Sequence, residues 1–184
     1  MTTRRTVLLG GFGAGVFVAA ASGWAWLSVG YSLPPGTVAV ALSEKELAVV
    51  AALTEALVPG EDGMPNGLAL GVPQRVDEEV WAAPPAIQSD LKAALLLLEH
   101  APPLVGFASR FTHLDVDARR ACLRAMLAAD KEVLVEAATA LKQMIHLFTY
   151  ARDEAWPAIG YDGPRVGRAL PESARAYAQL TKRG

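Results

Sequence analysis

Apolar residues recur every three or four positions along most of the chain, which is the spacing of one face of an α-helix. Stretches with this spacing begin near Ser43, Pro73, Ile87, Asp115 and Lys131. Residues 43–164 hold no useful length of the alternation that is typical of a strand. The pattern predicts an all-α fold, a compact domain of about five to six helices after an N-terminal apolar segment.

Local signals mark where several of these helices begin and end. Ser43 followed by Glu46 forms a capping box, and Asp115 is suited to cap a later helix. We expect the first helix of the domain to end at Pro59 and the last to run over residues 131–150.

The apolar stripes also predict which side chains are buried. They group Trp81 with Val76 and Val80, Ile87 with Leu95 and Leu98, and Val133 with Leu141 and Ile145. We expect each group to face the core of the domain.

Two adjacent arginines precede the longest apolar run of the chain. Arg4 and Arg5 stand before residues 7–29, which contain no charged side chain and are long enough to cross a bilayer as a helix. The stretch TRRTVLL, residues 3–9, resembles the twin-arginine (Tat) signal, which exports proteins that are already folded. We therefore expect residues 1–31 to be a twin-arginine signal or a membrane anchor.

The fate of this leader stays open. Residues 19–21 are all alanine and offer a cleavage site, whereas the length of the run and the aromatic residues at its end favour retention as an anchor.

Two further patterns lie in and after the leader. The glycines at positions 10, 11, 13 and 15 do not form a dinucleotide-binding G-x-G-x-x-G motif. Residues 32–42 contain Pro-Pro-Gly and predict an extended linker before the domain of residues 43–164.

Charge and cysteine content narrow the range of functions. The 184 residues carry 17 basic and 19 acidic side chains, so the formal charge is −2. A mildly acidic chain lacks the basic surface that nucleic acids require, so we expect no nucleic-acid partner. A single cysteine, Cys122, excludes an internal disulfide and any multi-cysteine metal site.

The chain offers little visible chemistry. His100, His113 and His146 form no H-x-x-x-H or H-E-x-x-H pair, and Cys122 has no base beside it in the sequence. A nucleophile elbow and a phosphate loop are both missing from the sequence. We therefore predict no catalytic, cofactor-binding or metal-binding residues in this chain.

The most distinctive stretch is DEAWPAIGYDGP, residues 153–164. Large apolar groups stand here among prolines and glycines, so they lie on an irregular segment and not on a helix stripe. Such a segment can present anchors to a partner protein. The predicted interface residues are Trp156, Pro157, Ile159, Tyr161 and Asp162. The alternative is that the same aromatic residues fold back and close the end of the helix bundle.

Two separated blocks carry a resemblance to one family. The stretch ALTEALVPGEDGMPNGLALGVPQRVDEEV looks like its opening block, and ALKQMIHLFTYARDEAWPAIGYDGP looks like its closing block. The chain thereby resembles the gluconate 2-dehydrogenase subunit 3 family over residues 44–164. Its members are small subunits that accompany flavin-containing dehydrogenases of the glucose-methanol-choline (GMC) class.

The resemblance implies a non-catalytic accessory subunit. Such a subunit binds the FAD-containing dehydrogenase, stabilises it and carries it through the Tat translocase to the periplasm or the periplasmic face of the inner membrane. The FAD then belongs to the partner subunit, from which electrons pass to a cytochrome c or another acceptor. The membrane is a further partner if the leader is retained. Residues 165–184 form a basic C-terminal tail to which the sequence assigns no role.

A second interpretation belongs to a different class of function. The chain could be a membrane-tethered helical module that itself binds haem or quinone and transfers electrons. An absorption spectrum of the purified protein separates the two interpretations, because a bound haem gives a Soret band.

Overall fold

The computed structural model describes residues 30–164. The chain divides between Ser32 and Leu33 into two units, and the helical fold belongs to the second. Its α-helices are α2 (Glu44–Leu57), α3 (Val72–Ala82), α4 (Pro85–His100), α5 (Val116–Leu127) and α6 (Glu132–Tyr150). Four short 3-10 turns complete it, namely η1 (Pro102–Val105), η2 (Phe111–His113), η3 (Asp153–Ala155) and η4 (Pro157–Ile159). No strand occurs among residues 30–164, so the predicted all-α class is confirmed.

The predicted caps are present at two of these helices. The Ser43 side chain accepts a hydrogen bond from the backbone N–H of Glu46, and the Glu46 carboxylate accepts one from the N–H of Ser43, which completes the capping box. Asp115 caps α5 through the N–H of Ala118. In the part of the chain that the structure describes, no helix is both long enough and apolar enough to cross a membrane.

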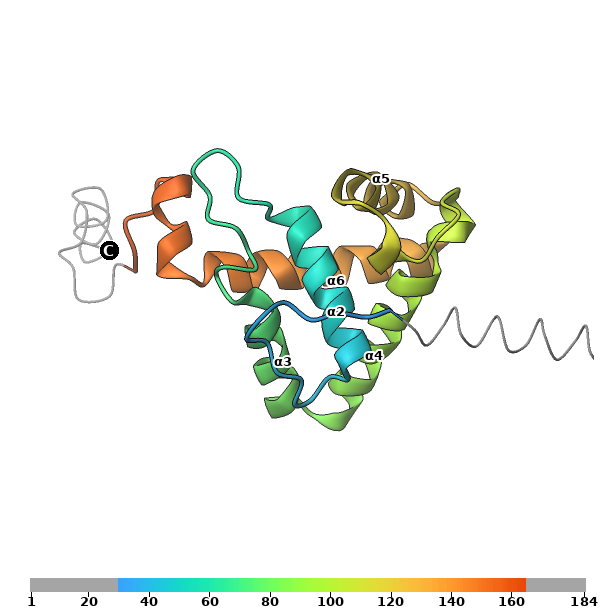
Figure 1. Cartoon of the computed structure of the whole chain (residues 1–184), viewed down its shortest axis with the longest axis horizontal. Coiled ribbons are helices and arrows are strands. Elements are labelled where there is room, and N and C mark those ends of the chain that lie inside the picture. The colour runs from blue at the N-terminus through green and yellow to red at the C-terminus, as the bar shows by residue number, and fades with distance from the viewer. Residues whose placement is uncertain (1–29, 165–184) are drawn as a thin grey trace, which may run out of the picture. The chain divides into compact units, whose positions relative to one another are not determined.

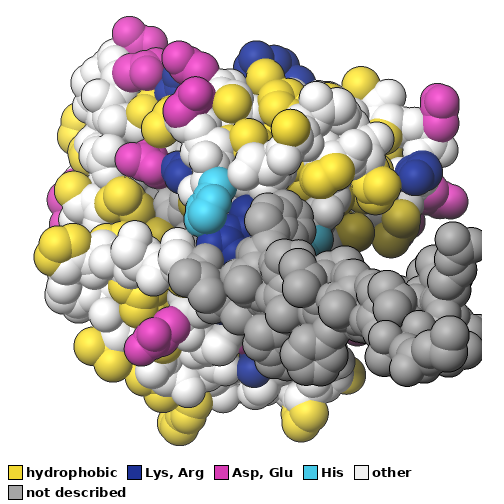
Figure 2. Space-filling model, turned by 45° about the vertical axis from the view of Figure 1, so that its right-hand side comes forward, with side chains coloured by type: hydrophobic (Ala, Val, Ile, Leu, Met, Phe, Trp, Pro, Cys, Tyr) yellow, Lys and Arg dark blue, Asp and Glu magenta, His cyan; other side chains and the backbone are white. Residues whose placement is uncertain are grey.

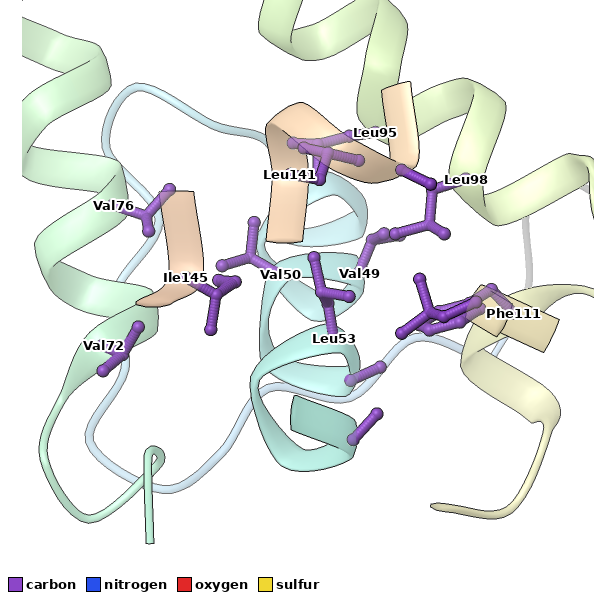
Figure 3. Close-up of a cluster of buried hydrophobic side chains, with 14 of the residues drawn as sticks. Val49, Val50, Leu53, Val72, Val76, Leu95, Leu98, Phe111, Leu141 and Ile145 are labelled. Carbon is purple, nitrogen blue, oxygen red and sulfur yellow. The ribbon is translucent and has the colours of Figure 1, made fainter. Parts of the chain in front are cut away.

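Helix α2 is the centre of the fold (Figure 1). It contacts α3, α4, α5 and α6, so it has neighbours on most of its circumference. Its buried residues are Leu47, Ala48, Val49, Val50, Ala51, Ala52, Leu53, Thr54 and Ala56. Figure 3 shows side chains of α3, α4 and α6 converging on Val49, Val50 and Leu53. The one buried hydroxyl of the helix, that of Thr54, donates to the carbonyl oxygen of Val50 at 2.8 Å, so it leaves no unpaired donor inside the core.

Three residues that the apolar stripes assigned to the core are exposed. Trp81, Ile87 and Val133 have 68%, 56% and 57% of their surface accessible. Each lies in the first or last turn of its helix. Helices that cross at an angle cover one another only along their middle turns, so the terminal turns project beyond their neighbours. The stripe prediction is therefore wrong at these three ends and correct for the residues grouped with them.

The segment that the sequence marks as a linker is held against the helices by one buried carboxylate. Asp77 of α3 is 1% exposed. Its oxygens accept hydrogen bonds from three consecutive backbone N–H groups, those of Val40 at 3.0 Å, Ala41 at 3.1 Å and Leu42 at 2.7 Å. On the other side, the Lys92 ammonium donates to the carbonyl oxygen of Ala41 at 2.8 Å. Residues 40–42 are therefore fixed in front of the capping box that starts α2.

A second buried carboxylate holds the irregular segment between α4 and α5. Glu99 is completely buried and Arg110 is 1% exposed, and Nε of Arg110 lies 3.4 Å from a Glu99 oxygen. Glu99 also accepts from Thr112, from its backbone N–H at 3.0 Å and from its hydroxyl at 2.7 Å. Arg110 Nη2 lies 2.6 Å from Nε2 of His113. The charge pair is thus enclosed in a polar cluster within an apolar core, as a buried ion pair requires.

Removing the first carboxylate should loosen the segment that precedes α2. In Asp77→Ala the N–H groups of residues 40–42 lose their shared acceptor; the buried N–H of Leu42 then stays unpaired, which costs about 1–3 kcal/mol, and the partly exposed N–H groups of Val40 and Ala41 cost less. We expect faster hydrogen exchange at these three amides, measured by NMR or mass spectrometry. Glu78→Ala, which changes the exposed neighbouring carboxylate, is the control and should leave the exchange unchanged. Equal protection in both variants would show that Asp77 does not hold the segment.

Removing the second carboxylate should destabilise the whole domain. Glu99→Ala leaves the buried Arg110 without its counter-charge, for which the expected loss is about 3–5 kcal/mol of unfolding free energy. Glu99→Gln keeps an acceptor for Thr112, so it should lose less unfolding free energy than Glu99→Ala. The measurement is the urea midpoint by circular dichroism. Glu154→Ala, at an exposed pair with Arg152, is the control, and a midpoint shift as large as that of Glu99→Ala would contradict the assignment.

Candidate functional site

The segment predicted to bind a partner follows directly after α6. Its two turns, η3 and η4, are anchored by Ala155, which is completely buried. Nε1–H of Trp156 donates to the carbonyl oxygen of Tyr150 at 2.9 Å, so the indole ring closes the last turn of α6. The ring of Tyr161 meets that of Trp156 edge to face, with centroids 5.2 Å apart. These contacts give the segment one defined conformation.

The predicted interface residues divide into two sets. Trp156 is half-buried against the helix end, whereas Pro157 and Asp162 are exposed. Ile159 and Tyr161 keep 49% and 42% of their surface accessible. The segment thus closes the bundle end with one aromatic ring, as the second alternative expects, while other apolar groups point outward; that these bind a partner stays a prediction.

Helix α6 adds two exposed side chains that sequence reasoning missed. Leu147 and Tyr150 are 65% and 44% exposed, and three residues apart they are neighbours on one helix face. The signal was present, because Leu147 is a large apolar residue outside the stripe through Leu141 and Ile145. Leu147, Tyr150, Ile159 and Tyr161 together are named the C-terminal apolar surface.

Exposure of one apolar side chain is not evidence of a binding surface. Apolar side chains are scattered among charged ones over the face shown in Figure 2, as is normal for protein surfaces. The C-terminal apolar surface differs because its members come from two consecutive elements that hydrogen bonds and ring contacts tie together.

A cleft of about 260 Å³ borders this surface. Tyr150, Thr149 and His146 of α6 line one side. The other side consists of residues 57–61, Met64 and Arg120. Figure 1 shows the loop that follows α2 and the turns that follow α6 at the same end of the domain. Segments almost ninety residues apart in the sequence therefore meet at one site.

The loop that follows α2 is packed tightly enough to give the cleft a fixed wall. Asn66 donates to the carbonyl oxygen of Pro59 at 3.0 Å and accepts from the N–H of Leu68 at 2.8 Å. A Cβ atom on Gly67 would lie 2.6 Å from the methyl carbon of Thr54 and 3.0 Å from Cβ of Val58. Only glycine allows the loop to approach α2 so closely.

The histidine of the cleft is neutral, and its arginine and glutamate are paired. Burial, helped by the nearby Lys142 charge, lowers the pKa of His146, so this imidazole is neutral at pH 7. Its ring lies 5.9 Å from that of Tyr150. Arg120 donates to the carbonyl oxygen of Ala56 at 2.9 Å and to Glu61 at 3.1 Å. The cleft therefore has polar walls but holds no uncompensated charge of its own.

The other candidate groups lie in separate environments. His100 Nε2 lies 3.0 Å from the Lys45 ammonium, and His113 contacts Arg110. Burial raises the pKa of the Cys122 thiol to about 11, which keeps it protonated. Across the described residues, no three His, Cys, Asp or Glu side chains are grouped to hold a metal ion. Arg4 and Arg5 lie outside the described residues.

Comparison with known proteins gives one match. The family model described as gluconate 2-dehydrogenase subunit 3 matches residues 44–163, which includes α2 to α6 and both walls of the cleft. No curated protein and no solved structure matches the chain.

The close approach at Gly67 can be tested by a double-mutant cycle. Gly67→Ala should lower the unfolding free energy by about 1–3 kcal/mol, because the new methyl group overlaps that of Thr54. Thr54→Ser removes that methyl group and keeps the hydroxyl bond to Val50. Denaturant unfolding of the four proteins should give a favourable coupling of at least about 0.5 kcal/mol between the two changes. Additive effects would mean that the loop does not pack on α2 at this point.

Proposed function

The chain belongs to the gluconate 2-dehydrogenase subunit 3 family, and from this premise we propose that it is a non-catalytic accessory subunit that binds, stabilises and exports a flavin-containing dehydrogenase of the GMC class. The family match over residues 44–163 is the observation that carries the proposal. A subunit of a dehydrogenase complex has a dehydrogenase as its partner.

The arrangement of the domain supports a binding role. Both sequence blocks of the resemblance contribute to the cleft, and the C-terminal apolar surface lies beside it. Exposed aromatic residues on a fixed backbone are the kind of group that dominates the energy of protein interfaces. Under the proposal the FAD belongs to the partner, and this chain contributes the surface to which the partner binds.

The leader supports a role in export. A flavoprotein folds around its cofactor before it crosses a membrane, so it needs a pathway for folded cargo. The Arg4-Arg5 motif of this chain would supply the signal for both proteins. The complex would then act in the periplasm or at the periplasmic face of the inner membrane, where the flavin passes electrons to a cytochrome c or another acceptor.

Co-expression tests this proposal. The full chain and its FAD-dependent dehydrogenase should copurify as a complex with flavin absorbance, and dehydrogenase activity should appear in the periplasmic fraction. The variant Arg4→Lys with Arg5→Lys should keep the complex but leave most of its activity in the cytoplasm, because the translocase no longer recognises the leader.

Fractionation with a second exported enzyme is the control. A separate Tat substrate in the same cells should reach the periplasm normally, which shows that the pathway itself works. Secretion of the dehydrogenase that is unaffected by the double substitution would refute the export role. Failure of the unaltered chain to bind the dehydrogenase would refute the accessory role.

A further inference from the structure

We propose that the C-terminal apolar surface and the neighbouring cleft are the docking site, and that the occupant is a region of the dehydrogenase subunit with apolar groups bordered by Arg and Lys side chains. This inference rests on the proposed function and specifies the chemistry of the contact. It goes beyond the interface segment that the sequence indicates, because it adds α6 and the loop after α2.

The apolar part of the site has the properties of an interface core. Leu147 is 65% exposed although it lies on a helix whose opposite face is fully buried. The indole of Trp156 is fixed by its bond to the Tyr150 carbonyl and meets the ring of Tyr161 edge to face. Because the backbone of these turns and the Trp156–Tyr161 pair are held in place, binding here costs little additional conformational entropy.

The charge around this core is strongly one-sided. Residues 58–71 and 150–164 carry five carboxylates, Glu61, Asp62, Asp153, Glu154 and Asp162, against one basic side chain, Arg152. Arg120 at the cleft is bonded to Glu61 and to the end of α2, so with its charge included the formal charge of this border is −3. A positively charged border on the partner would complement it.

The cleft is suited to one side chain of the partner. Its volume of about 260 Å³ is below the range of about 300–1,000 Å³ that is usual for small-molecule sites. It offers the Glu61 carboxylate and the neutral imidazole of His146, both of which accept hydrogen bonds. A hydrogen-bond donor that enters from the partner would find acceptors on two sides.

Charge also decides between the partner subunit and a second copy of this chain. In two copies that met through this surface, −3 would face −3 across the described residues, which is unfavourable at low salt. Across residues 30–164 there are 18 acidic and 10 basic side chains, so the described part of the chain is acidic as a whole. A basic border on the dehydrogenase is the complement that this distribution favours.

The test measures the affinity of the full chain for the FAD-loaded dehydrogenase subunit by surface plasmon resonance. Leu147→Ser with Ile159→Ser should weaken binding by about 30-fold or more, the loss expected when one hot-spot side chain is removed. The matched control is Ile87→Ser with Leu104→Ser, because these apolar residues are exposed to a similar degree, at 56% and 58%. The control should leave the affinity unchanged, and circular dichroism should show that both variants are folded.

A second pair of variants tests the charge of the border. Asp153→Lys with Glu154→Lys should slow association at low salt, and the difference should largely disappear near 1 M salt, where charges are screened beyond about 3 Å. The control Asp90→Lys with Glu136→Lys, on α4 and α6, should change the association rate far less. If the two double substitutions changed the association rate equally, the proposed basic border on the dehydrogenase would be refuted.

The remaining outcomes separate the competing occupants. If the unaltered chain binds the dehydrogenase and the Leu147 and Ile159 variant binds equally well, the docking site is wrong while the accessory function stands. If the unaltered chain does not bind, the proposed function itself fails.

Concentration-dependent dimers that the Leu147 and Ile159 variant abolishes would identify a second copy of this chain as the occupant. If the dehydrogenase binds more tightly after Arg165, Arg168 and Arg175 are changed to Glu, the basic tail of this chain is identified as the occupant of the site. Either of these last two results overturns the proposal.

Discussion

The burial of α2 on nearly all sides is the constraint on which the rest of the structure depends. A helix whose buried residues lie around most of its circumference cannot be stable alone, because its apolar surface must be removed from water by neighbours. Helices α3, α4, α5 and α6 provide this cover, and their crossings at α2 leave their terminal turns projecting. The many alanines of α2 allow these neighbours to approach closely, and Gly67 lets the following loop do the same.

Irregular segments have no apolar stripe to hold them, and here buried carboxylates take that role. Asp77 collects three consecutive N–H groups of the segment before α2. Glu99 holds Thr112 and Arg110 in the segment between α4 and α5. In both cases a charged group is stable inside the protein because several donors surround it. The two carboxylates therefore fix backbone that hydrophobic packing alone would leave undefined.

The consequence for function is that one end of the domain combines rigidity with exposed apolar groups. The turns after α6 are held by the Trp156 bond and by the burial of Ala155, and the loop after α2 is held by Asn66 and Gly67. Between them lie a polar cleft and an acidic border. A preorganised surface lowers the entropic cost of binding, which is what the proposed accessory role requires.

The fold class, two helix starts and the family followed from the sequence. Helical spacing determined the all-α class, the capping box and Asp115 located two helix starts, and the two family blocks identified the family. These features depend on residues within a few positions of one another, so a linear pattern contains them. The burial of Asp77 and Glu99, the exposure of Trp81 and Leu147, and the meeting of Met64 with His146 at one cleft depend on elements far apart in the chain. Only the tertiary structure could decide them, because burial is set by which helix packs over a side chain, and the sequence does not state that.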